Sequence, residues 1–165
     1  MSKQQTIRIN LIRHGPTTAP QHTFVGSTDV PLSGKGLGGL QGLANKLHGI
    51  EQWYASPMLR TRQTLEQLQQ HGCPIKSICY DKCLREVDFG RWELQTFAQI
   101  SKTDPAAIES WNNYQDFSFP EGESVAHFTQ RAEEMLNLFK NATHSNIGVV
   151  THGGIIRTMI CLALD

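Results

Sequence analysis

Four short apolar segments, which we interpret as strands, are each followed at once by side chains that can do chemistry. In an α/β protein, ligands bind outside the carboxyl ends of the parallel strands. We therefore expect these side chains to lie together at one edge of a sheet. In chain order they are Arg13 and His14, Ser56 with Arg60 and Arg62, Glu86 and Asp88, and His152 with Gly153 and Gly154.

Phosphoryl transfer is the chemistry that fits this set. A neutral imidazole, whose ordinary pKa is about 6.5, is a competent nucleophile near pH 7. Neighbouring arginines would disfavour protonation of His14, and their planar forks match phosphate oxygens in bidentate fashion. His14 is therefore the candidate nucleophile, and Arg13, Arg60 and His152 are the candidate groups around the phosphate.

A leaving alkoxide needs a proton, and a carboxylic acid in the right place can supply it. Such general acid catalysis accelerates a reaction by roughly 10²–10⁴-fold. Glu86 is the candidate donor, and Asp88, two residues later, is the alternative.

Each of these residues, taken alone, has an ordinary structural explanation. A single His after a strand is usually a hydrogen-bonded loop residue, and Arg60 with Arg62 could form a solvated helix face. The Gly153-Gly154 pair could serve only a turn that needs a flexible backbone. Their shared position at strand ends favours an active site over these separate explanations.

The hydrophobic pattern predicts strands that alternate with helices. Strands are expected over 6–12, 52–55, 78–80 and 146–151, and helices over 57–70, 123–141 and 154–164. Ser56-Pro57 is expected to start the first of these helices. A further helix is predicted after Ser33, weakened by glycines and with its apolar positions at Leu37, Leu40, Ala44 and Leu47. This order predicts an α/β fold, a three-layer sandwich in which a mostly parallel sheet is flanked by helices.

Residues 86–122 are rich in Pro, Gly and Trp and predict an excursion from the sheet, with a short helix near 105–114. We expect a single domain over 1–165, with about 89–123 as a lid-like segment. Trp92 and Trp111 are interpreted as packing residues of the core or lid rather than as substrate contacts.

The overall composition favours no charged macromolecular partner. The 165 residues carry 15 basic and 15 acidic side chains, for a formal net charge of zero, so we expect neither nucleic acid nor membrane binding. The four cysteines match no zinc or disulfide pattern, and the polar start is not a targeting segment, which predicts a cytoplasmic protein. The G-x-G-x-x-G spacing at 34–39 does not follow a strand directly, and the histidines form no compact metal set.

Ordered motifs along nearly the whole chain resemble the histidine phosphatase (phosphoglycerate mutase-like) superfamily. They are Leu11-Ile12-Arg13-His14-Gly15, Thr28-Asp29-Val30-Pro31-Leu32-Ser33, Ala55-Ser56-Pro57 with Arg60 and Thr64, Leu84-Arg85-Glu86 with Phe89-Gly90-Arg91-Trp92-Glu93, Pro120-Glu121-Gly122-Glu123-Ser124, and Val150-Thr151-His152-Gly153-Gly154. The set in this order is far more specific than Arg-His-Gly alone.

The resemblance implies a phosphatase without metal or other cofactor, in which His14 is phosphorylated and Glu86 donates the proton. Arg13, Arg60 and His152 would complete the catalytic set. Pro16 replaces a frequent Glu of the family, and Pro20 replaces a frequent phosphate-binding Asn. Either Thr17 or Thr18 substitutes for that Asn, or fewer groups hold the phosphate. The expected substrate-binding residues are Arg13, Thr17, Arg60, Glu86, His152 and Gly153.

The substrate implied by the resemblance is a small phosphorylated metabolite. The excursion is most similar to the alpha-ribazole phosphatase subgroup of cobalamin synthesis, which suggests alpha-ribazole 5′-phosphate. The alternatives are a phosphoglycerate mutase-type transfer, disfavoured because the chain is short, a broad sugar-phosphate phosphatase, a phosphohistidine protein phosphatase, and a phosphate-binding module without turnover. Relatives commonly continue into another strand after the helix at 154–164. Its absence, natural or not, would leave a sheet edge that could pair with a second copy as a homodimer.

Overall fold

The structure is a computed structural model that describes residues 6–164. A four-stranded parallel sheet lies at its centre. The strands are β1 (Arg8–Arg13), β2 (Gln52–Ala55), β3 (Ile78–Tyr80) and β4 (Asn146–Thr151). Their order is β1-β4-β2-β3 and every neighbouring pair is parallel. The predicted strands are confirmed, except that the first begins at Arg8 and ends at Arg13 rather than spanning 6–12.

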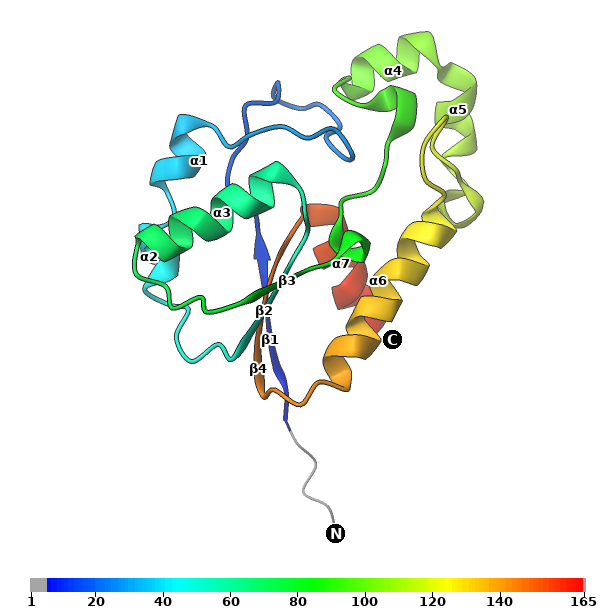
Figure 1. Cartoon of the computed structure of the whole chain (residues 1–165). Helices are drawn as coiled ribbons and strands as arrows, with labels where there is room; N and C mark the ends of the chain where they lie inside the picture. Colours follow the sequence, from blue (N-terminus) through cyan, green and yellow to red (C-terminus); the bar gives the residue numbers. More distant parts are fainter. Residues whose placement is uncertain (1–5, 165) are drawn as a thin grey trace.

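Helices cover both faces of this sheet, which confirms the three-layer α/β architecture (Figure 1). On one face lie α1 (Gly34–Gly38), α2 (Gln41–Ala44) and α3 (Leu59–Gln70). On the other face lie α6 (Val125–Lys140) and α7 (Gly153–Leu164).

The two faces of the sheet carry alternate residues of each strand, as the period of two in a strand requires. Ile12, Trp53 and Val150 pack into the core under α2 and α3. Ile147 and Val149 pack into the core under α6 and α7. Gly148 is needed where Trp53 crosses it, because a Cβ there would lie 2.6 Å from the indole ring.

Two helix predictions are corrected by the structure. Ser33 caps a helix as expected, its side chain accepting from Gly36 N, but the helix stops at Gly38 and a separate short helix follows. The five glycines over 34–42 explain the break, because glycine costs roughly 1 kcal/mol in a helix interior. The helix predicted from 57 begins at Leu59, with Met58 and not Ser56 at the N-cap.

The excursion contains more structure than the sequence pattern predicts. It includes the 3₁₀ turns η2 (Gly90–Trp92) and η3 (Tyr114–Asp116) and the helices α4 (Phe97–Thr103) and α5 (Pro105–Ser110). The expected helix near 105–114 corresponds to α5, whereas α4 was not predicted. A capping box between Thr96 and Gln99 starts α4 and is a signal that could have found it.

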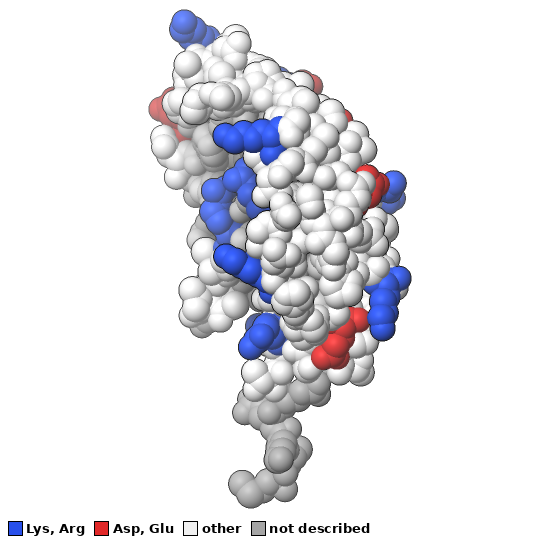
Figure 2. Space-filling view, turned by 90° about the vertical axis from the view of Figure 1, so that its left-hand side faces the viewer, with Lys and Arg blue, Asp and Glu red and all other residues white. Residues whose placement is uncertain are grey.

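Charge on the face that carries α1–α3 is mostly positive. Figure 2 shows Lys and Arg side chains spread over this face, with few Asp or Glu among them. The net charge of the chain is zero, so this excess is local. Within residues 6–164, none of the helices has the length and apolar character needed to cross a bilayer.

Candidate active site

The register of the sheet places three predicted site segments in one row. Arg13 pairs with Thr151 across β1 and β4, and Ala55 of β2 pairs with Val150 of β4. The backbone pairing continues past the strand ends, since His14 N donates to Thr151 O at 3.0 Å and Ser56 N donates to Val150 O at 3.0 Å. His14, His152 and Ser56 therefore leave adjacent strands at the same edge.

His14 is held in one tautomer by its own loop. Its Nδ1 lies 2.8 Å from Gly15 O, and since a carbonyl only accepts, Nδ1 carries the proton and Nε2 keeps a free lone pair. Burial lowers the pKa of His14 to about 4, the Gly15 hydrogen bond opposes the shift, and the charges of Arg60 and Arg13 lower it further. The ring is therefore neutral near pH 7.

His152, fully buried, lies beside His14 with ring centroids 5.1 Å apart. Arg60 Nε donates to His152 Nδ1 at 3.1 Å, so Nε2 must carry the proton and donate to Ser56 Oγ at 2.8 Å. Burial, followed by the charge of Arg60, strongly lowers the pKa of His152. Both ring nitrogens of this neutral histidine thus have partners in the protein.

Arg60 is fully buried and is oriented by the loop after β1. Its Nη1 donates to Thr28 O at 2.9 Å and its Nη2 donates to Gly26 O at 2.7 Å. With the Nε bond to His152, three of the five guanidinium donors are used. Two donors remain for an anion.

Glu93 fixes the loop that holds Arg60. Its carboxylate accepts from the backbone N–H groups of Gly26, Ser27, Thr28 and Phe89 at 2.8–3.2 Å. In the sequence, Glu93 stands within the Phe89-Gly90-Arg91-Trp92-Glu93 motif, and nothing in that motif indicates this role. A carboxylate that serves four N–H groups from two distant segments could not be recognised without the fold.

Glu86, from the segment after β3, reaches the same edge through the start of α7. Gly154 N donates to Glu86 Oε2 at 2.8 Å, and Val87 N donates to Oε1 at 3.2 Å. Its rival Asp88 is engaged in the loop, where Oδ1 accepts from Ser27 Oγ at 2.8 Å and from Gly90 N at 2.9 Å.

The remaining candidates divide into those at the edge and those away from it. A Cβ on Gly153 would lie 3.4 Å from Arg13 Nε, so the Arg13 side chain passes close to Gly153. Arg62 points away and lies over the Tyr80 ring, 5.2 Å from its centroid. Thr17 is half-buried in the loop and forms a bridge with Leu32, and exposed Pro20 accepts from Thr23 Oγ1.

Two cavities adjoin Glu86. One, of about 450 Å³, is lined largely by charged residues and extends over Arg131 and Glu123. The other, of about 830 Å³, lies between the excursion, α6 and α7 and is lined by Gly154, Arg157 and aromatic side chains. The aromatic residues are Phe24, Phe89, Trp111, Tyr114, Phe119 and Phe128. Throughout residues 6–164, no group of three or more His, Cys, Asp and Glu side chains is arranged to hold a metal ion.

The chain is similar to proteins named as alpha-ribazole phosphatases and to one named as a phosphoglycerate mutase. The chain is 29% identical over 160 residues to an adenosylcobalamin/alpha-ribazole phosphatase of Escherichia coli, covering 93% of this chain and 77% of the relative. The structure of the alpha-ribazole phosphatase from Shigella flexneri matches with a TM-score of 0.82 and 26% identity, covering 94% of this chain and 79% of that one. A Salmonella arizonae protein named "Probable phosphoglycerate mutase" is 29% identical over 139 residues, covering 79% of this chain and 61% of the relative.

The family follows from a match that spans almost all of the described chain. The family model of the histidine phosphatase superfamily (branch 1) matches residues 9–165, and it therefore includes the row of residues at the sheet edge. This protein belongs to the histidine phosphatase superfamily, branch 1.

Proposed function

We propose that the protein hydrolyses phosphomonoesters through a phosphohistidine formed on His14. The observation that carries this proposal is the state of that residue: a buried imidazole with Nδ1 bonded to Gly15 O and a pKa of about 4. Such a ring presents a free, unprotonated Nε2 over the whole physiological pH range. The site therefore offers a nucleophile that needs no separate base.

In the first step, His14 Nε2 attacks phosphorus, the N–P bond forms and the bond from phosphorus to the ester oxygen breaks. Arg13 and the two remaining donors of Arg60 stabilise charge on the phosphoryl oxygens. Arg60 is suited to this because its fork is already oriented by Gly26 O and Thr28 O and needs no reorganisation during the reaction.

His152 keeps Arg60 in place as a neutral acceptor. To bind the phosphate directly, its Nε2–H would have to exchange Ser56 Oγ for a phosphoryl oxygen. We assign it this second role because it lies beside His14.

In the same step, protonated Glu86 gives its proton to the leaving oxygen and becomes a carboxylate. In the second step, this carboxylate takes a proton from water, the water oxygen attacks the phosphohistidine, and inorganic phosphate leaves. Glu86 is favoured over Asp88 because the Glu86 carboxyl group reaches the sheet edge at Gly154 N, two residues after His152, and borders the larger cavity. Asp88 Oδ1 is instead bonded to Ser27 and Gly90 in the loop. Each residue returns to its starting state.

For the substrate, we propose a small metabolite whose alcohol carries a flat aromatic group, with alpha-ribazole 5′-phosphate as the first choice. The apolar cavity of about 830 Å³ begins at Glu86, the proposed donor to the leaving group. Its size and largely apolar lining are typical of small-molecule sites. The E. coli and S. flexneri relatives, named as alpha-ribazole phosphatases, support the same choice.

A mutase is the second candidate, because one relative is named as a phosphoglycerate mutase. The two enzymes share the first step and differ in whether water or a second hydroxyl takes the phosphoryl group from His14. Product analysis with 3-phosphoglycerate separates them, since a mutase yields 2-phosphoglycerate and a phosphatase yields glycerate and inorganic phosphate.

The test is phosphate release, in the presence of EDTA, from alpha-ribazole 5′-phosphate, 2- and 3-phosphoglycerate and fructose bisphosphates. The control is His14→Ala. We expect the fastest release from alpha-ribazole 5′-phosphate and none from the variant. Turnover of another ester alone would contradict the proposed substrate and leave the proposed mechanism in place. Full activity in His14→Ala would overturn the mechanism.

A further inference from the structure

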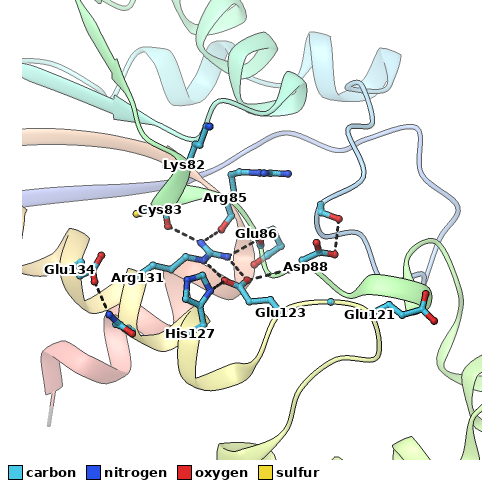
Figure 3. A pocket seen from close by; sticks show the side chains of 13 residues that line it. Lys82, Cys83, Arg85, Glu86, Asp88, Glu121, Glu123, His127, Arg131 and Glu134 are labelled. Carbon is cyan, nitrogen blue, oxygen red and sulfur yellow. Dashed lines mark hydrogen bonds and ion pairs between the residues drawn. The ribbon is translucent and has the colours of Figure 1, made fainter.

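Arg131, on α6, is a buried guanidinium whose donors are aimed at the main chain of the segment that carries Glu86. Its Nη1 donates to Cys83 O at 2.8 Å and to Arg85 O, and its Nη2 donates to Glu86 O at 3.0 Å. Figure 3 shows the guanidinium lying between this main chain and the carboxylate of Glu123. Arg131 thus binds both sides of the residue that bears the proposed acid.

Glu123 completes the arrangement from the other side. Its two carboxylate oxygens accept from Arg131 Nε at 2.7 Å and from Nη2 at 2.8 Å. The same carboxylate accepts from Asp88 N at 3.3 Å, and Glu123 N donates to Asp88 O at 2.9 Å. The Arg131–Glu123 pair therefore ties α6 to the chain on both sides of Glu86.

The position of the Glu86 carboxyl group depends on this main chain. The carboxyl group itself is held only by the N–H groups of Val87 and Gly154 among the described residues. A Cβ on Gly154 would lie 2.3 Å from Glu86 Oε1, so the fit at the start of α7 is tight. A shift of the Glu86 backbone would therefore move the carboxyl group out of this place.

We propose that Arg131, locked by Glu123, is a positioning residue for the proton donor Glu86. The inference rests on the proposed function, because it requires Glu86 to protonate the leaving group. In addition, α6 would control proton transfer to the ester oxygen, because Arg131 on this helix holds the main chain that positions Glu86. The hydrogen bonds of Arg131 reach neither His14 nor His152, and its charge is a minor contribution to the lowered pKa of His152. In this proposal it therefore affects the leaving group through Glu86.

The test uses the dependence of kcat/KM on the leaving group. An alkyl phosphate needs a proton on its leaving oxygen, whereas 4-nitrophenyl phosphate, with a stable phenolate, does not. Glu86→Gln should slow the alkyl ester by about 10²–10⁴-fold and leave the nitrophenyl ester much less affected. Arg131→Lys and Glu123→Gln should slow the alkyl ester by about 10–100-fold, since a displacement of about 1 Å can cost 10²-fold, with little change for the nitrophenyl ester.

Two controls separate positioning from folding. His127→Gln removes a contact to Glu123 Oε1 but none to the 83–86 segment, and should leave both esters unchanged. Phe139→Leu perturbs the buried core of the same helix and should lower stability without changing the ratio between the esters.

A double-mutant cycle gives the decisive outcome. If Arg131 acts through Glu86, Glu86→Gln/Arg131→Lys should be no slower on the alkyl ester than Glu86→Gln alone. Fully additive losses, or an equal loss of both esters in Arg131→Lys, would overturn the inference while the proposed function stands. Absence of leaving-group selectivity in Glu86→Gln would instead overturn the assignment of Glu86 as the acid, and this inference with it.

Discussion

The sheet edge and the excursion are stabilised in different ways. At the edge, Ser56, Arg60 and His152 are all 0% exposed and are joined in series by hydrogen bonds. In the excursion, Trp92 lies among rings at 5.5–6.1 Å, in an aromatic cluster whose members are Phe24, Trp92, Trp111, Phe117 and Phe119. Hydrogen bonds depend strongly on direction, whereas aromatic pairs are favourable in both offset-stacked and edge-to-face arrangements over a range of centroid distances.

This difference suggests that the two regions have separate functions. The edge would provide the phosphoryl chemistry for any ester, because its donors and lone pairs are set before the substrate arrives. The excursion would choose the ester, because its side chains line the cavity that starts at Glu86. The following predictions test whether the two regions separate in this way.

The largest effect is expected for Arg60→Lys, which keeps the charge and loses the planar fork. We expect kcat/KM to fall by about 10²–10³-fold, equally for alpha-ribazole 5′-phosphate and for 4-nitrophenyl phosphate. Steady-state kinetics on both esters measure the loss. Arg62→Lys, on the exposed side of the same helix, is the control and should retain activity. A loss confined to one ester would contradict this separation of functions.

A smaller and selective effect is expected for Tyr114→Ala. Tyr114 is 51% exposed and lines the apolar cavity. Aromatic contacts contribute about 0.5–1.5 kcal/mol, which corresponds to about 2–10-fold. We expect a loss of this size in kcat/KM for alpha-ribazole 5′-phosphate and no change for glycerol phosphate, with Tyr114→Phe close to the parent. An equal loss for both esters would place Tyr114 in the chemistry and not in selection.

The smallest change is expected in the protonation of His14 when the pH is lowered from 7 to 5. Burial and the adjacent arginines hold the pKa of His14 at about 4, below the ordinary value of about 6.5. Between these values the unfolded chain binds a proton at this site that the folded chain does not, so the contribution of His14 to stability decreases as pH falls. In NMR spectra, the His14 ring resonances should stay at neutral positions down to pH 5. A midpoint near 6.5 would contradict the account.

The sequence allowed the fold and the site edge to be predicted because both depend on local patterns. Strands such as 146–151 are short apolar runs, and residues that follow parallel strands meet at one edge by topology. The apolar spacing of Leu40, Ala44 and Leu47 predicts a longer helix after Ser33 than the structure contains, because the glycines among these residues break it into two short helices.

Long-range partners could not be predicted from the sequence. Ser56 was read as a helix cap, and in the structure it accepts from His152, 96 residues away. Glu93 and Arg131 each bind main-chain groups of distant segments, and main-chain groups have no signature in the sequence. The proposed roles of His14, Glu86 and Thr17 remain predictions.

The central claim is that His14 carries the phosphoryl group, and trapping that intermediate tests it most directly. The protein would be mixed with ³²P-labelled substrate, quenched within milliseconds in alkali, digested and analysed by mass spectrometry, with His14→Ala in parallel. We predict phosphate on the peptide that contains His14, stable in alkali and labile in acid, and none in the variant. Phosphate on another residue would contradict the account. So would turnover that leaves no detectable phosphoenzyme under conditions chosen to slow its hydrolysis.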